Sequence, residues 1–379
     1  MVNADKESPF WRRWANFVMR RPVPVMLLGL VLVALCLVPF TKLNPSDAEA
    51  GRLPGPATND AIQGRTALQQ AGISPGVIKP LVVLIEGNGS QAVRAATVAA
   101  VSATPGVLGA SAPDTGWRKG TTQLVEAFSA YDGSASATGP VISKLQNDVL
   151  PSVAGRAGIG TRATLGGVAA ESRDFVHAVY DNFPYVLAFV VVLTYLLLMR
   201  AFRSLLLPLK AVILNLISLA AAYGIIVFIF QQGHGSQAIW GVQATGAIIS
   251  WIPLMIFAFL YGLSMDYEVF MLTRMREAYD ETGDTPAAIS LGLARTGKLV
   301  TSAALVLMFA FFVLSTGPSV DIKQFGIGLA AGIIFDATVI RMLLVPSIMR
   351  LFGEANWYLP AGLARVLRVR PRRLASDEA

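Results

Sequence analysis

Six long apolar stretches constrain the fold of this chain more than any other feature of its sequence. An α-helix of about 20 apolar residues crosses a hydrocarbon layer of about 30 Å, because it rises about 1.5 Å per residue. The first, second, third and fifth stretches contain no charged side chain, which argues against buried helices of a soluble protein. The sequence therefore predicts an α-helical membrane protein with six transmembrane helices, at residues 23–41, 183–199, 211–230, 244–273, 299–320 and 324–349.

The overall composition supports this interpretation. The 379 residues are 54% hydrophobic and 15% charged, whereas soluble domains average about 45–50% and about 25%. Lipid is therefore the expected surroundings for much of the chain.

Basic residues are distributed unevenly among the loops. Eighteen Lys and Arg residues lie before the first stretch, between the second and third, between the fourth and fifth, and after the sixth, whereas the other two short loops contain only Lys323. Basic residues in short loops stay on the cytoplasmic side. Both terminal segments, residues 1–22 and 350–379, are therefore predicted to be cytoplasmic. The net charge of +7 fits attraction to the anionic membrane surface, and we expect no nucleic-acid partner.

A cleaved signal peptide is an alternative for the first stretch, because charged residues precede it and Ala48-Glu49-Ala50 resembles a cleavage site. The apolar run is long and ends at Phe40, well before that tripeptide, which favours a membrane-spanning helix. The single cysteine, Cys36, lies in this run and cannot form an intrachain disulfide, so we expect it to serve in packing.

The sequence predicts that residues 42–182 form an extracytoplasmic α+β domain. Strands are expected at residues 80–86, 107–110, 123–129 and 162–165, and helices at 90–104 and 138–149. The order strand, helix, strand, strand, helix, strand is the split βαβ, or ferredoxin-like, layout. An amphipathic helix at residues 171–180 is expected to lead into the second span.

The remaining segments are predicted to be cytoplasmic. In the loop at residues 274–298, Thr285-Pro286 resembles an N-cap followed by proline at the first helical position, which predicts a surface helix starting there. The tail at residues 350–379 is basic and is expected to bind the membrane surface.

Asp266 is the strongest candidate for a functional residue. An ionisable group inside a span costs about 2.5–3.5 kcal/mol on insertion scales, so it is expected to face a protein interior and to act in function. More than 20 uncharged residues precede Asp266, and Arg274 follows it at the cytoplasmic end of the span. Such a carboxyl could exchange a proton near neutral pH, although a structural hydrogen-bonded carboxylate is the alternative. Tyr267 is a possible hydrogen-bond donor or a packing residue, and Glu268 is expected to be solvated.

Asp336 is the second intramembrane carboxylate. Gly328 and Gly332 precede it at four-residue steps, and small residues on this face would admit a neighbouring helix, for which the Asp266 helix is the natural candidate. Arg341 lies five residues later, about 140° around an α-helix, so it could pair with a carboxylate on a neighbour or extend to the membrane surface.

Few other residues suggest chemistry. Thr301 and Ser302 could relay a proton, or could bond their own helix backbone. The two histidines, His177 and His234, are both expected outside the membrane, and no metal, nucleotide or nucleophile pattern is present. We expect a protein that is not an enzyme and has no cofactor other than a proton gradient.

Several motifs together resemble the MMPL branch of the resistance–nodulation–division transporters. These are Phe202-Arg203-Ser204-Leu205-Leu206-Leu207-Pro208, Gly262-Leu-Ser-Met-Asp-Tyr-Glu-Val-Phe270, Thr296-Gly297-Lys298, Asp336-Ala-Thr-Val-Ile-Arg341, Val345-Pro346 and Asn356-Trp357-Tyr358-Leu359-Pro360. The resemblance covers nearly the whole chain, and residues 42–182 match least.

The resemblance implies proton-driven export of lipids, glycolipids or amphipathic drugs across a bacterial plasma membrane. It assigns Asp266 and Tyr267 to an Asp-Tyr proton relay, with Asp336 and Arg341 on the same path. It also implies that this chain corresponds to the C-terminal half of a typical member. We therefore expect a second copy, or a homologous N-terminal half, as a partner, together with lipid cargo and membrane lipids. A lipid-binding regulatory protein that does not pump, and the non-functional half of a split gene, are the alternatives.

Overall fold

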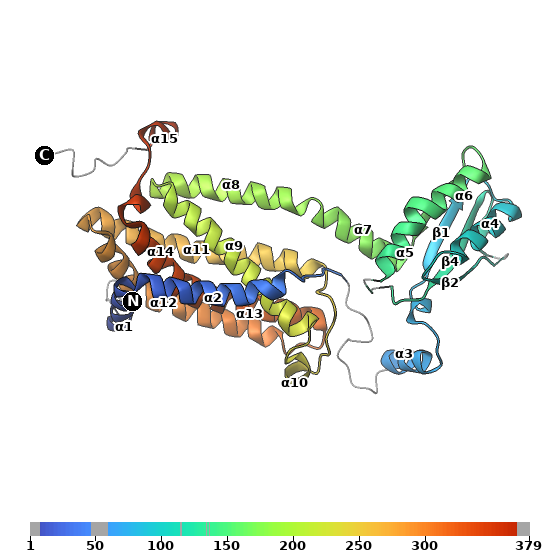
Figure 1. The fold of residues 1–379 in the computed structure, drawn as a ribbon, viewed down its shortest axis with the longest axis horizontal. Coiled ribbons are helices and arrows are strands. Elements are labelled where there is room, and N and C mark those ends of the chain that lie inside the picture. Colours follow the sequence, from blue (N-terminus) through green and yellow to red (C-terminus); the bar gives the residue numbers. More distant parts are fainter. Residues whose placement is uncertain (1–7, 47–59, 114–115, 134, 136, 370–379) are drawn as a thin grey trace. The chain divides into compact units, whose positions relative to one another are not determined.

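The computed structural model describes residues 8–46, 60–113, 116–133, 135 and 137–369. The chain forms two compact units, and Figure 1 labels their elements in chain order. The bundle unit comprises Met1–Leu43, Phe183–Ile229 and Trp251–Ala379, and the sheet unit comprises Asn44–Asn182 and Phe230–Ser250. Residues 47–59, after the first span, and the last residues of the basic tail, 370–379, lie outside the described residues.

The bundle unit is helical. Its elements are α1 (Pro9–Arg20), α2 (Pro22–Phe40), α8 (Phe183–Phe202), α9 (Leu206–Ile226), α11 (Trp251–Thr282), α12 (Thr285–Leu314), α13 (Val320–Phe335), η5 (Asp336–Leu344), α14 (Val345–Phe352), η6 (Gly353–Trp357) and α15 (Ala361–Val366).

The described residues contain six helical segments that are long and apolar enough to cross a membrane. They are Pro22–Phe40, Val168–Phe202, Leu206–Gln231, Trp251–Thr282, Thr285–Leu314 and Val320–Trp357. The prediction of six such helices is confirmed. The side of the membrane on which the termini lie stays a prediction.

The loop expected between the fourth and fifth spans is much shorter than predicted. Helix α11 continues to Thr282 and α12 begins at Thr285. The helix start predicted at Thr285-Pro286 is therefore confirmed, whereas the prediction of a separate surface helix is wrong, because this helix continues into the fifth span. Asp284, and not Thr285, caps α12, because its side chain accepts a 2.9 Å hydrogen bond from the backbone N–H of Ala287. The proline that follows Thr285 occupies the first turn, where its missing N–H costs nothing.

Small residues set the closest helix contacts in the bundle. A Cβ added at Gly224 of α9 would lie 1.7 Å from the carbonyl oxygen of Cys36 in α2, so the two backbones touch. Cβ atoms added at Gly328 and Gly332 of α13 would meet the side chains of Ile256 and Leu260 at 2.4 and 2.6 Å. These two residues belong to α11, so the glycine face of α13 does admit the Asp266 helix, as predicted.

The sheet unit contains an antiparallel sheet with helices against it. Its elements are α3 (Asp60–Gln70), η2 (Pro75–Val77), β1 (Leu81–Glu86), α4 (Gln91–Ser102), β2 (Val107–Ser111), β3 (Arg118–Lys119), β4 (Thr122–Ser129), α5 (Thr138–Lys144), η3 (Leu145–Val149), α6 (Leu150–Ala157), β5 (Arg162–Gly166), α7 (Val168–Tyr180) and α10 (Ser236–Trp240). The segment η4 (Val227–Gln231) continues α9 and is divided between the two units.

The strands are arranged in the order β2-β4-β1-β5, with β3 paired to β4, and all these pairs are antiparallel. This is the order of the split βαβ layout. The strands and the helix at 90–104 coincide with the predicted ones within two residues, whereas the helix predicted at 138–149 continues through α6 to Ala157. Sequence reasoning missed α1, α3 and the short β3.

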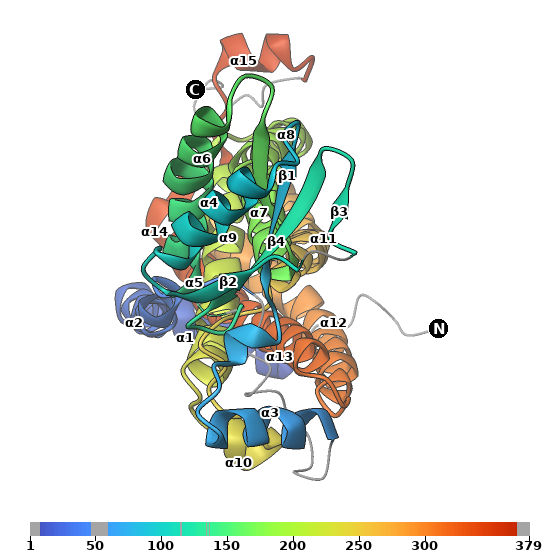
Figure 2. The same ribbon diagram turned by 90° about the vertical axis from the view of Figure 1, so that its right-hand side faces the viewer.

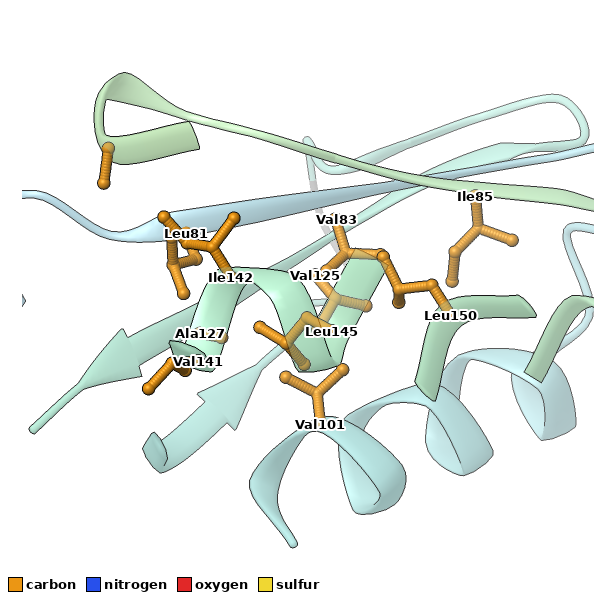
Figure 3. Packing of buried hydrophobic residues seen from close by; sticks show 11 residues of the cluster. Leu81, Val83, Ile85, Val101, Val125, Ala127, Val141, Ile142, Leu145 and Leu150 are labelled. Carbon is orange, nitrogen blue, oxygen red and sulfur yellow. The ribbon is translucent and has the colours of Figure 1, made fainter. Parts of the chain in front are cut away.

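The core of the sheet unit lies between the strands and the helices α4, α5 and α6. Alternate residues of β1, Leu81, Val83 and Ile85, are fully buried, and Figure 3 shows them in one cluster with Val101 of α4 and Leu145. Helices α4 and α6 lie next to each other against the sheet (Figure 2). A period of two in burial along β1 is what one covered face of a sheet produces.

Three connecting segments meet within the sheet unit. The backbone N–H of Asn44, after α2, donates to the side chain of Gln231 at 3.2 Å, and Ser46 N–H donates to the carbonyl of Ile248 at 2.9 Å. The ends of α2 and α9 and the segment before α11 are therefore tied together.

We predict that Gly224→Ala destabilises the bundle by about 1–3 kcal/mol or more, because the added methyl collides with a backbone carbonyl and α2 must move away from α9. Thermal unfolding of the purified full chain measures the effect. The fraction of protein that remains in the monodisperse peak after heating gives the unfolding temperature. Gly362→Ala is the matched control, since nothing lies within 4 Å of its Cβ position. Equal unfolding temperatures for the two variants would contradict the close contact.

Candidate functional site

Proline shapes the segment that carries both Asp336 and Arg341. Pro346 has no N–H, and its ring would clash with the carbonyl of Met342 in a regular α-helix. The chain before it widens into the π-helical η5, Asp336–Leu344. A π-helix bonds residue i to residue i+5, so residues five apart lie above one another. Asp336 and Arg341 are five apart, and this widening brings them onto one side.

Asp336 and Arg341 form a buried ion pair. Nη2 of Arg341 lies 2.6 Å from Oδ2 of Asp336, and their side chains are only 4% and 7% exposed. The pairing that the sequence left open is therefore made within the same helical segment, and Arg341 does not extend to a membrane surface. A buried charge is tolerated when it is paired and hydrogen-bonded.

Helix α11 completes the surroundings of this ion pair. The hydroxyl of Ser264 donates to Oδ2 of Asp336 at 2.9 Å, and the backbone carbonyl of Ser264 accepts from Arg341. The guanidinium carbon of Arg341 lies 5.4 Å from the ring centre of Tyr267, a cation–π contact. Nε and Nη1 of Arg341 are buried and find no acceptor among the described residues.

A small cavity opens beside the pair. Its lining includes Ser264, Tyr267, Asp336 and Arg341, and its volume is about 10 Å³, roughly enough for one water molecule. A carboxylate beside a phenol can exchange a proton through a water bound in such a cavity, and the guanidinium, which stays protonated, can orient that water by donating hydrogen bonds. The structure therefore brings three of the four predicted relay residues together.

Asp266 does not join them. It is exposed on α11, and its carboxylate has no hydrogen-bond or ion-pair partner among the described residues. The expectation that Asp266 faces the interior is wrong for this single chain. The physical reason is helical phase: Ser264 faces Asp336, and two residues of an α-helix turn by about 200°, so Asp266 points the opposite way.

Glu268, in contrast, is buried at 4% exposure, so the expectation that it is solvated is wrong. It lies four residues after Ser264 and therefore on the same inward face of α11. Charge interactions connect it with Arg341, Asp336 and Lys210. Lys210 of α9 and Glu268 line a second cavity of about 10 Å³.

Lys210 is held by the end of the last span. Its Nζ donates to Oδ1 of Asn356 and lies 5.2 Å from the ring centre of Phe352. Asn356 in turn donates to the carbonyl of Met349 at 2.7 Å. Sequence reasoning gave no role to Lys210, because it lies at the edge of an apolar stretch and resembles an ordinary loop cation.

The hydroxyl groups of α12 stay within their helix. Thr301 donates to the carbonyl of Gly297 at 2.6 Å and Ser302 to that of Leu299 at 3.0 Å. These hydroxyl groups thus bond to their own helix backbone, which is one of the two roles predicted for them. His177 is exposed on α7, and the described residues contain no group of three or more His, Cys, Asp or Glu side chains placed to hold a metal ion.

The sequence of this chain matches a known protein family. The MMPL family model matches residues 141–376. The chain belongs to the MMPL family. It is therefore a multi-pass plasma-membrane protein of a transporter family, as the motifs predicted.

Curated relatives extend the match to almost the whole chain. The haem uptake protein MmpL11 of Mycobacterium tuberculosis is 33% identical over 96% of this chain and 37% of the relative. The mycolic acid-containing lipids exporter MmpL11 of Mycolicibacterium smegmatis is 31% identical over 95% of the chain and 38% of the relative. The trehalose monomycolate exporter MmpL3 of M. tuberculosis is 30% identical over 96% and 38%. This chain thus spans little more than a third of the length of these relatives.

We predict that Asp336→Asn destabilises the protein by about 3–5 kcal/mol, because it leaves the Arg341 charge buried without a partner. The double variant Asp336→Asn/Arg341→Gln should recover a large part of this loss, since both charges are then absent. Thermal unfolding of the wild type, the two single variants and the double variant gives the coupling free energy. Additive losses from the two single changes would contradict the ion pair.

Proposed function

We propose that this chain is one half of a transporter driven by the proton-motive force, which exports lipids, glycolipids or amphipathic drugs across the plasma membrane. One observation carries the proposal: a carboxylate, Asp266, lies in the middle of an exposed and otherwise uncharged face of α11. That face contains Met255, Phe259, Gly262, Asp266 and Phe270.

The spacing of these residues, at steps of three and four, places them on one side of the helix. Phe259 is 43% exposed and Phe270 37% exposed. A charged Asp facing lipid costs about 2.5–3.5 kcal/mol on insertion scales, and intramembrane carboxylates face protein or water. The face therefore fits a contact with a second half, which would cover Asp266 and complete the relay that Tyr267, Asp336 and Arg341 begin.

The second half is either another copy of this chain or a homologous N-terminal half. Its existence is supported by the relatives, which are more than twice as long as the matched region. A pair of such halves would be related by a pseudo-twofold axis along the membrane normal, as in other transporters built from parallel repeats.

Proton movement through such a pair would use the ionisable groups on the two faces of α11 one after another. Asp266 would exchange its proton at the contact between the halves, and Asp336 with Arg341 would respond on the opposite face of α11. Glu268 and Lys210 extend the chain of charges along the same inner face. We add these two residues to the proposed path because Glu268 is buried, Lys210 is partly buried, and both line one cavity next to the ion pair.

The sheet unit offers a place for the polar part of a cargo. A cavity of about 350 Å³ is lined by Thr138, Ser143, Ser172, Arg173 and neighbouring residues, a volume typical of small-molecule sites. Arg173 is fixed there, since its Nη2 donates to the hydroxyl of Ser143 at 2.6 Å. Two relatives support the proposed cargo class, since they are named as exporters of mycolic acid-containing lipids and of trehalose monomycolate.

The orientation is proposed from the basic residues: both termini in the cytoplasm, and the sheet unit outside it. The segments that follow α2 and α9 and precede α11 support the second part, because all three are bonded within that unit. They would then leave the membrane on the same side.

We predict that Asp266→Asn leaves the chain folded, because the side chain is exposed, yet abolishes proton-coupled transport. The measurement uses vesicles containing the complete assembly, a trapped pH-sensitive dye and a fluorescently labelled glycolipid. Glu126→Gln, on β4 of the sheet unit, is the matched loss of one carboxylate elsewhere. Unchanged proton entry and glycolipid movement in Asp266→Asn would remove the main support, and would favour a lipid-binding protein that does not pump.

We predict that Gly262→Leu disrupts assembly of the two halves without destabilising the single chain. Nothing lies within 4 Å of the Cβ position of Gly262, so the bundle unit can accept the larger side chain, whereas a second helix packed on this face cannot. Mass measurement of the detergent-solubilised particle checks the outcome, with Gly362→Leu as control. A wild-type particle that transports as a single chain would contradict the proposed pairing.

A further inference from the structure

Helix α1 packs on the bundle through one apolar stripe. Trp11, Ala15 and Val18, at helical steps of four and three, are buried. The indole of Trp11 lies over Gly297 of α12, where an added Cβ would come within 2.4 Å of the ring. The glycine of the Thr-Gly-Lys motif therefore leaves the space into which the indole of Trp11 packs.

The opposite face of α1 is exposed and combines aromatic with basic residues. Phe10, Arg13, Phe17 and Arg20 follow one another at steps of three and four, and all four are exposed. Phe10 is 65% exposed and Phe17 47% exposed. The helix sequence PFWRRWANFVMR contains no acidic residue. Aromatic rings between arginines are the pattern of a helix that lies in the headgroup region of a membrane.

The position of α1 fits that location. A single residue, Arg21, separates it from α2, which is the first of the long apolar helices. The backbone N–H of Ser8 donates to the carbonyl of Ala294 in α12 at 3.1 Å, so the helix is also held at its beginning. Lys298 of α12 follows Gly297, the residue that Trp11 contacts, and its exposed side chain adds a further positive charge.

One side chain of α1 reaches the segment that contains the ion pair. Nε1 of Trp14 donates to the carbonyl of Met342 at 3.1 Å. In an α-helix this carbonyl would accept from residue 346, but that residue is Pro346 and has no N–H. Trp14 thus supplies a donor to the carbonyl that proline leaves without its usual α-helical partner, one residue from Arg341.

We propose that the exposed face of α1 binds the anionic headgroups of membrane phospholipids, and that this binding stabilises η5 through the bond from Trp14 to Met342. The partner is a phospholipid of the bilayer, because the four exposed residues offer apolar anchors together with positive charges, and the anionic membrane surface matches both. Lipid composition would then act on the segment that holds Asp336 and Arg341. This inference does not depend on the direction of transport or on the cargo.

The test measures lipid binding and backbone protection in the full chain, without a transport assay. Wild type and variants are placed in nanodiscs of phosphatidylcholine alone or with phosphatidylglycerol, and hydrogen–deuterium exchange is followed in residues 336–344. Native mass spectrometry counts the phosphatidylglycerol molecules retained. We expect phosphatidylglycerol to slow exchange in this segment of the wild type severalfold.

Three variants distinguish the binding of lipid to α1 from the effect of that binding on η5. Arg13→Gln/Arg20→Gln should bind phosphatidylglycerol roughly thirtyfold more weakly, since each basic side chain near an anionic surface contributes about fivefold, and should lose the slowed exchange. Arg13→Lys/Arg20→Lys keeps the charge and should behave as wild type. Trp14→Phe keeps an aromatic ring but removes the N–H donor. Lipid should therefore still bind to this variant, while the slowing of exchange in residues 336–344 disappears.

Arg118→Gln/Lys119→Gln is the matched control, because it removes two exposed cations from β3 of the sheet unit. The proposal fails if this control loses the effect as well, or if Arg13→Gln/Arg20→Gln keeps it. It also fails if Trp14→Phe retains the slowed exchange. Slowing by soluble glycerol phosphate in phosphatidylcholine discs would overturn the assignment to membrane lipid.

Discussion

A positive and a negative charge buried together inside an apolar bundle are the constraint on which the rest of this structure depends. Asp336 and Arg341 are each stable there only because the other is 2.6 Å away. Their remaining hydrogen-bonding capacity is met partly by Ser264, through both its hydroxyl and its carbonyl. Helix α11 must therefore approach this segment closely, and the glycines at 328 and 332 allow that approach. Small residues, a hydroxyl and an ion pair thus form one arrangement rather than three separate features.

Pro346 links this arrangement to the helix before the first span. The proline excludes regular α-helical bonding just before it, and the resulting π-helical turn brings residues five apart into register. The same proline leaves the carbonyl of Met342 without its usual α-helical donor, and Trp14 of α1 occupies that place. One residue in a Val-Pro motif therefore determines both the pairing of Asp336 with Arg341 and the contact with α1.

The parts that sequence could predict are those governed by local periodicity. The strands of the sheet unit follow from alternating apolar residues, such as Leu81, Val83 and Ile85, and six spans follow from length and hydropathy. The pairing of Asp336 with Arg341 could not be predicted, because the angle between them was taken from an α-helix that the chain does not form there. The positions of Asp266 and Glu268 were reversed for a related reason, since hydropathy gives the depth of a residue but not the side of the helix on which it lies.

The contact between α13 and α11 shows which side faces inward. The glycine face of α13 had been matched to the helix of Asp266, and that contact falls on Ile256 and Leu260. Steps of four from these residues reach Ser264 and Glu268, whereas Asp266 lies about 200° from Ser264. The positions of both carboxylates thus follow from this one contact, but the sequence did not show which residues of α11 meet the glycines.

In the proposed assembly of two halves, the opposite placement of these carboxylates would let one helix couple them. Helix α11 is continuous from Trp251 to Thr282, with Asp266 on its outer face and Ser264 and Glu268 on its inner face. A change of charge at Asp266, once that face is covered by a second half, would alter the packing of a helix whose other side contacts Asp336 and Arg341. Because the helix has no proline or π-helical break between these positions, it would move as one body. Binding of a proton at the contact between the halves would then change the packing around the ion pair, and no carboxylate would have to move from one face of the helix to the other.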